Sequence, residues 1–72
     1  MVKIYTKPAG CVQCTQTKKW LEKNGVEYTE LSLEEPENMD FVKSMNVLQA
    51  PVVLTDDDMW SGFAPSKLET LL

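Results

Sequence analysis

Two cysteines three positions apart, Cys11 and Cys14, constrain this chain more than any other feature of its sequence. They follow a run of strand-forming residues at 2–6 and a turn at 7–10, and they open a run suited to a helix at 12–23. In the first turn of a helix, residues i and i+3 lie on one side, near the Cα separation of roughly 5.5 Å that a disulfide needs. The fold must therefore place two thiols where a helix begins after a strand.

Strand and helix signals alternate along the rest of the chain. The second helix has two competing start signals, a Ser32-to-Glu35 capping box and Pro36 at the first helical position. We predict strands at 2–6, 26–33, 50–55 and 59–61, and helices at 12–23 and 65–72. The second helix is predicted to run from one of its two possible starts to about Asn46. The order β-α-β-α-β-β-α predicts an α/β fold with a four-stranded mixed sheet. This is the minimal thioredoxin/glutaredoxin architecture, formed by residues 1–72 as one domain.

Composition excludes several kinds of chemistry. The 72 residues contain no histidine and no arginine. Without histidine there is no Ser–His or Cys–His pair, and without arginine there is no bidentate fork for phosphate, carboxylate or guanine. A net charge of −4 and a pI near 4.6 argue against a nucleic-acid partner, which calls for a basic patch. The two thiols remain as the strong nucleophiles.

Charge and hydropathy suggest a compartment. Residues 1–25 carry a net charge of +4 and residues 26–72 a net charge of −8, so the segment with both cysteines is basic. No apolar run approaches the roughly 20 residues that span a bilayer, and the first residues lack the apolar region of a secretory signal. We therefore expect a cytoplasmic protein with no membrane partner. In that compartment a disulfide is more often catalytic than structural.

The position of the two cysteines predicts different roles for them. A helix N-terminus offers unpaired N–H groups and a partial positive charge, which lower the pKa of a thiol from about 8.5. Cys11 lies nearest the helix end, so we expect it to be the exposed attacking thiolate. Cys14 lies one turn further in and is expected to resolve the mixed disulfide. Lys7 and Lys18 are candidates for additional electrostatic support.

Two other uses of the cysteines compete with redox chemistry. A structural disulfide here closes only four residues, which the chain-entropy model values at roughly 2 kcal/mol. A zinc site needs about four ligands, so two chains would have to supply two thiolates each. A CxxC between a strand and a helix of a βαβ unit instead indicates a thiol–disulfide oxidoreductase. A zinc-binding dimeric module remains the alternative from another class.

Two later segments complete the candidate site. In a fold of this type the proline that precedes the third strand lies opposite the CxxC, and we expect the Ala50–Pro51 bond to be cis. The backbone of Ala50 would then face outward and pair with an incoming peptide as an added strand. In segment 60–63, the residues alone favour a core position for Phe63. They leave Trp60 open between core and docking surface.

Four motifs together resemble the NrdH-redoxins, which are small glutaredoxin-like proteins that act like thioredoxins. The motifs are Tyr5-Thr6-Lys7-Pro8-Ala9, Cys11-Val12-Gln13-Cys14, Ala50-Pro51-Val52-Val53 and Trp60-Ser61-Gly62-Phe63. The resemblance covers essentially the whole chain. It implies a dithiol electron donor to class Ib ribonucleotide reductase, a donor that is itself reduced by NADPH-dependent thioredoxin reductase. No cofactor or metal is expected. It also implies that Cys11 attacks, Cys14 resolves and Pro51 is cis.

The resemblance further implies a partner-binding surface beside the cysteines on a monomeric protein. Its predicted residues are Lys7, Val12, Gln13, Ala50, Pro51, Trp60, Ser61, Gly62 and Phe63. A glutathione-dependent glutaredoxin is the alternative, but the Gly-Gly turn and aspartate that hold glutathione are replaced at 61–66. The sequence departs from the NrdH pattern at an extra Gly10. It also departs at Ala64 and Ser66, where an arginine and an acid are common.

Overall fold

The computed structural model describes residues 1–7, 9–47 and 49–72 of the chain. Strands and helices follow one another in the predicted order, with a final 3-10 turn. The elements are β1 (Lys3–Thr6), α1 (Val12–Lys23), β2 (Thr29–Ser32), α2 (Pro36–Ser44), β3 (Val52–Leu54), β4 (Met59–Ser61), α3 (Pro65–Leu68) and the 3-10 turn η1 (Glu69–Leu71). The turn predicted at 7–10 includes Pro8, which lies outside the described residues.

The four strands form one mixed sheet in the order β2-β1-β3-β4. β1 pairs in parallel with β2, so that Ile4 lies opposite Glu30. β1 also pairs antiparallel with β3, which pairs antiparallel with β4, and Val53 thus lies between Ile4 and Trp60. The mixed four-stranded fold predicted from the sequence is confirmed. Because β1 is central, the segment that leads from it to Cys11 starts from a strand paired on both sides.

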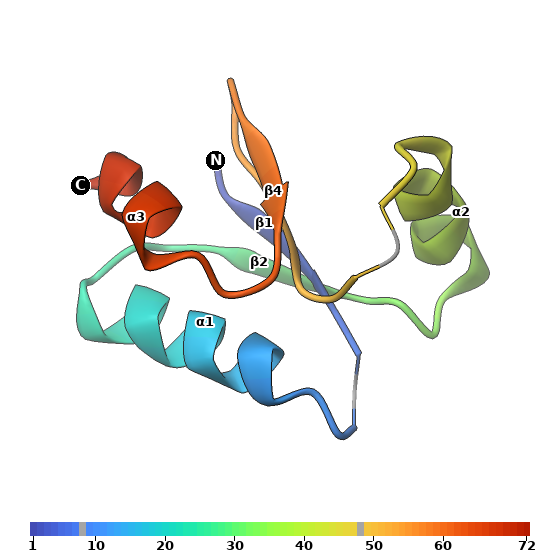
Figure 1. Cartoon of the computed structure of the whole chain (residues 1–72), viewed down its shortest axis with the longest axis horizontal. Coiled ribbons are helices and arrows are strands. Elements are labelled where there is room, and N and C mark those ends of the chain that lie inside the picture. The colour runs from blue at the N-terminus through green and yellow to red at the C-terminus, as the bar shows by residue number, and fades with distance from the viewer. Residues whose placement is uncertain (8, 48) are drawn as a thin grey trace.

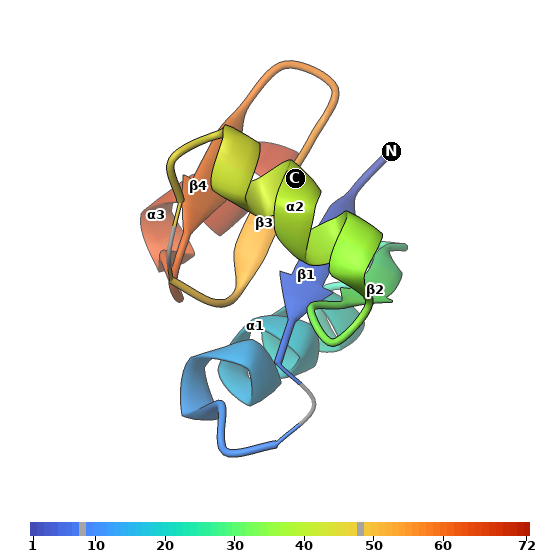
Figure 2. The same cartoon turned by 90° about the vertical axis from the view of Figure 1, so that its right-hand side faces the viewer.

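Helices cover both faces of the sheet, with α1 and α3 on one face and α2 on the other (Figures 1 and 2). Successive residues of a strand point to opposite faces. Ile4 accordingly belongs to the core under α1 and α3, whereas Tyr5 belongs to the core under α2. The first core contains Val2, Ile4, Leu21, Val53, Trp60 and Leu68, and the second contains Tyr5, Leu33, Val42 and Val52.

Several element boundaries differ from the sequence prediction. β2 begins at Thr29 rather than at residue 26, because the N–H of Val26 donates to Leu21 O at 2.9 Å and so closes the end of α1 instead of joining the sheet. β3 is limited to Val52–Leu54. The C-terminal helix changes after Leu68 into a 3-10 turn.

The start of α2 follows one of the two alternatives, and its end lies earlier than predicted. The helix begins with Pro36 at its first position and with Glu35 as N-cap, and it has no side-chain cap. The capping box does not form, since Ser32 Oγ instead accepts from Glu34 N–H at 3.1 Å. The helix ends at Ser44, before Asn46, whose φ of 59° is left-handed and incompatible with a continued helix.

Candidate active site

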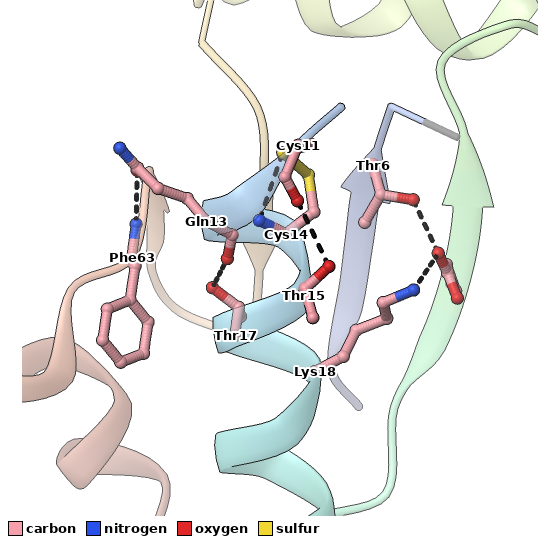
Figure 3. The surroundings of a disulfide bond; sticks show 9 residues. Thr6, Cys11, Gln13, Cys14, Thr15, Thr17, Lys18 and Phe63 are labelled. Carbon is pink, nitrogen blue, oxygen red and sulfur yellow. Dashed lines mark hydrogen bonds and ion pairs between the residues drawn. A yellow bond between two sulfur atoms is a disulfide. The ribbon is translucent and has the colours of Figure 1, made fainter. Parts of the chain in front are cut away.

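The two cysteines lie where α1 begins, and a disulfide joins them (Figure 3). Cys11 is the N-cap of α1 in an extended conformation, and its Sγ accepts a hydrogen bond from Cys14 N–H at 3.1 Å. Their Cα atoms are 5.3 Å apart, as expected for i and i+3 in a first turn. Cys11 is half-buried, whereas Cys14 is only 2% exposed. A partner's sulfur can therefore approach Cys11 far more readily than Cys14.

The surroundings of Cys11 Sγ favour negative charge on it. The sulfur replaces a capping oxygen at the positive end of the α1 dipole, and the first turn of α1 contains no acidic residue. The Cys14 N–H is already directed at this atom. The same contacts would stabilise a Cys11 thiolate in the dithiol form, which is the form that attacks a disulfide.

The two lysines considered for electrostatic support have different positions. Lys18 Nζ lies 3.2 Å from Glu30 Oε2, so its charge is already paired across α1 and β2. Lys7 is exposed and borders a cavity of about 230 Å³ beside Ala50, under α2. A larger open hollow, about 560 Å³, is lined by Met1 and Val2 at the opposite end of β1 and has no cysteine in its lining.

A polar cluster beside α1 was not foreseen from the sequence. Thr6, buried at the end of β1, donates through Oγ1 to Glu30 Oε2 at 2.7 Å, and Lys18 reaches the same oxygen. The Thr6 hydroxyl, together with Lys18, holds the pKa of Glu30 below its usual range, against an opposing effect of partial burial. The alternation of side chains along a strand could have indicated this position, because Thr6 lies on the same face of β1 as the core residue Ile4.

Segment 60–63 joins the site mainly through its last two backbone amides. Gly62 N–H donates to Pro51 O at 2.8 Å, and Phe63 N–H donates to Gln13 Oε1 at 2.9 Å. Figure 3 shows the Gln13 side chain extending from α1 towards Phe63. The structure thus brings together three of the segments predicted to form the partner-binding surface.

The individual side chains of the predicted surface are exposed to very different degrees. Val12, next to Cys11, is 71% exposed. Trp60, which the residues alone left open, is buried in the core at 7% exposed, and Phe63 is partly buried and packs against the same core. The Ala50–Pro51 bond is cis, as expected, and Pro51 is buried while Ala50 is half-buried.

The described residues contain neither a cluster of metal ligands nor a membrane-spanning helix. Within residues 1–7, 9–47 and 49–72, no three or more side chains of His, Cys, Asp or Glu gather as a metal site would require. In the same ranges no helix combines the length and the apolar character needed to cross a bilayer.

The sequence and the structure both resemble known redox proteins. The sequence pattern of the glutaredoxin family matches residues 2–60. The chain is 40% identical over 72 residues to the glutaredoxin-like protein NrdH of Lactococcus lactis subsp. cremoris, covering 99% of each. It is 35% identical to the NrdH protein of Salmonella typhimurium, covering 97% of this chain and 86% of the relative. The solved NrdH-redoxin of Escherichia coli, described as glutaredoxin-like with a thioredoxin-like activity profile, superposes with a TM-score of 0.94 at 33% identity, over 99% and 93% of the chains.

Proposed function

This chain belongs to the glutaredoxin family as a glutaredoxin-like oxidoreductase of the NrdH type, and we propose that it carries electrons from thioredoxin reductase to a protein disulfide of class Ib ribonucleotide reductase. The observation that carries this proposal is the asymmetry of the dithiol. Cys11 caps α1 at the surface, and Cys14 is buried behind it. We propose further that residues 1–72 act as one domain, as a monomer in the cytoplasm.

The proposed reaction passes through two exchanges. The Cys11 thiolate attacks one sulfur of the partner's disulfide, so that a bond forms between them and the partner's other sulfur leaves as a thiolate and takes up a proton. The Cys14 thiol loses its proton and its sulfur attacks Cys11 Sγ. This closes the internal disulfide and releases the second partner thiol. Two electrons pass to the partner, and the reductase returns two from NADPH.

The positions of the other residues support a protein rather than a tripeptide as substrate. The proposed partner surface combines the exposed Val12, the partly buried Phe63 and the backbone at Ala50, which pairs with the partner as an added strand. Lys7 supplies positive charge beside it. Since the chain contains no arginine, a bidentate clamp on either glutathione carboxylate is absent.

One assay separates the two sources of electrons. NADPH consumption is followed with the chain and a disulfide substrate, in the presence of either thioredoxin reductase or glutathione with glutathione reductase. We expect turnover with thioredoxin reductase and little with glutathione. Turnover with glutathione alone would make the protein a glutathione-dependent glutaredoxin and overturn the proposal.

The roles of the two cysteines are tested by trapping. In Cys14→Ser the attack by Cys11 still proceeds but resolution does not, so we expect a stable mixed disulfide with the partner on a non-reducing gel. Cys11→Ser should form none, because Cys14 is buried. Trapping by Cys11→Ser alone would exchange the two assignments. A sizing column run on the wild-type protein, with zinc analysis, checks the monomer against a metal-linked dimer.

A further inference from the structure

Two consecutive backbone amides connect segment 60–63 to both segments that flank the disulfide. The N–H of Gly62 donates to the carbonyl of Pro51, and the N–H of Phe63 donates to the side-chain carbonyl of Gln13, which lies between the two cysteines. The second bond joins residues 50 positions apart in the sequence. It is the contact through which a side chain of the CxxC fixes the backbone of the proposed partner surface.

The space beside Gly62 is shaped for this contact. Gly62 has a φ of +79°, a left-handed conformation that side chains rarely adopt. A Cβ built there would lie 2.9 Å from Gln13 Oε1, which is closer than real Cβ contacts. The missing side chain at Gly62 therefore leaves the room that the Gln13 carbonyl occupies on its way to Phe63 N–H.

The backbone from which Gln13 extends is itself held in place. Thr17, fully buried in α1, donates through Oγ1 to Gln13 O at 2.8 Å. Gln13 also lies in the helical turn that the Cys11 cap closes. The side chain thus reaches towards Phe63 from a fixed base, and its hydrogen bond with the Phe63 N–H transmits the position of the cysteines to the loop (Figure 3).

We propose that Gln13 is a positioning residue that holds Phe63 and segment 60–63 in register with the disulfide, so that a partner protein meets a preformed surface. This inference rests on the function proposed above. Gln13 is exposed, so its loss removes little buried surface. The loss acts instead on preorganisation, because an unheld loop must be ordered when the partner binds. The chemistry at Cys11 Sγ, which Gln13 does not touch, stays unchanged.

The test compares Gln13→Met with Gln16→Met, a matched change at an exposed glutamine one turn along α1. Methionine keeps the length and helix propensity of glutamine but lacks its carbonyl acceptor. Hydrogen exchange of the Phe63 amide, followed by NMR, reads the bond directly. We expect about fivefold faster exchange in Gln13→Met, as for a net hydrogen-bond contribution near 1 kcal/mol, and no change in Gln16→Met.

Kinetics show whether the same bond serves docking. We expect KM for thioredoxin reductase to rise about fivefold in Gln13→Met with kcat nearly constant, and the pH profile of Cys11 alkylation by a small reagent to match wild type. Gln13→Glu, which retains an acceptor oxygen, should restore the Phe63 protection.

Each adverse result has a distinct meaning. Unchanged Phe63 exchange in Gln13→Met overturns the inference at its first step. Faster exchange with unchanged KM overturns the link to docking, and a shifted alkylation profile would show that Gln13 acts on the thiol instead. Absence of wild-type turnover with thioredoxin reductase would contradict the proposed function. The Phe63 measurement would still decide whether Gln13 holds the loop.

Discussion

The helices on the two faces of the sheet differ in how many of their residues are buried. Under α1 and α3, helix and strand residues such as Leu21, Leu68 and Ile4 are fully buried. Within α2 the one buried residue is Val42, and partly buried methionines pack against the core to which it belongs. The cavity of about 230 Å³ lies on this second face, between α2 and the segment around Ala50.

This difference indicates where the molecule keeps its geometry fixed. Cys11, as the N-cap of α1, adjoins a helix whose inner side is buried at Cys14, Thr17 and Leu21, so that it cannot shift without disturbing that buried side. The face under α2 provides one wall near the site, beside Lys7 and Ala50, and leaves room there. Stability measurements on matched residues of the two faces can test this account.

The largest difference is expected between two helix residues of similar size. Leu21→Ala removes a fully buried side chain from α1 and should lower the free energy of unfolding by about 3 kcal/mol. Met39→Ala, in α2 beside the existing cavity, should lower it by about 1 kcal/mol because Met39 is only half-buried. Urea unfolding of the oxidised proteins measures both. Equal losses would show that the two faces are equally well packed.

A sharper comparison uses neighbouring valines of β3, both fully buried. Val53 faces α1 and α3, and Val52 faces α2. Each Val→Ala change removes about 1.6 kcal/mol of transfer free energy, with an added cavity term where neighbours cannot relax. We expect a loss of about 2.5 kcal/mol for Val53→Ala and about 1.6 kcal/mol for Val52→Ala in the same urea experiment. The opposite ranking would refute the account.

The sequence predicted the element order, the sheet and the position of both cysteines, because these depend on local patterns. Alternating apolar residues define the strands, and the CxxC at a strand-to-helix junction defines the site. Local patterns do not determine the boundaries of α2 and β2, because these depend on which of several hydrogen bonds forms. The Ser32 hydroxyl, which the pattern assigned to a helix cap, accepts from Glu34 N–H in a turn. The Val26 N–H, which the pattern assigned to a strand, donates to Leu21 O at the end of α1.

Contacts between distant segments could not be predicted. The bond from Phe63 to Gln13 spans 50 positions, and the ion pair of Lys18 with Glu30 joins α1 to β2. Neither pair stands out by spacing or residue type. The position of Trp60 also stayed open, since its burial depends on which face β4 presents.

A smaller effect is expected at Trp60, on the face under α1 and α3. Trp60 Nε1 is buried and has no hydrogen-bond partner among the residues that the structure describes. Trp60→Phe loses apolar contact but also removes a donor whose unsatisfied burial costs roughly 1–3 kcal/mol. The net loss in the free energy of unfolding should therefore stay below about 1 kcal/mol, measured by circular dichroism in urea. A loss above about 3 kcal/mol would show that this N–H is bonded in the native protein.

The smallest effect concerns the polar edge of the same face, where Thr6 and Lys18 lower the pKa of Glu30. A carboxyl whose pKa is lowered by folding stabilises the native state above its unfolded pKa, and this stabilisation is lost as pH falls through the folded pKa. Glu30→Gln should therefore lower the free energy of unfolding by about 0.5 kcal/mol at pH 7, since the Glu30 side chain is 41% exposed. The difference from wild type should shrink as the pH falls below about 4, in parallel urea titrations with the exposed Glu27→Gln as control. A difference that stays constant with pH would mean that the Glu30 charge does not contribute, and that this edge is held by the Thr6 hydrogen bond alone.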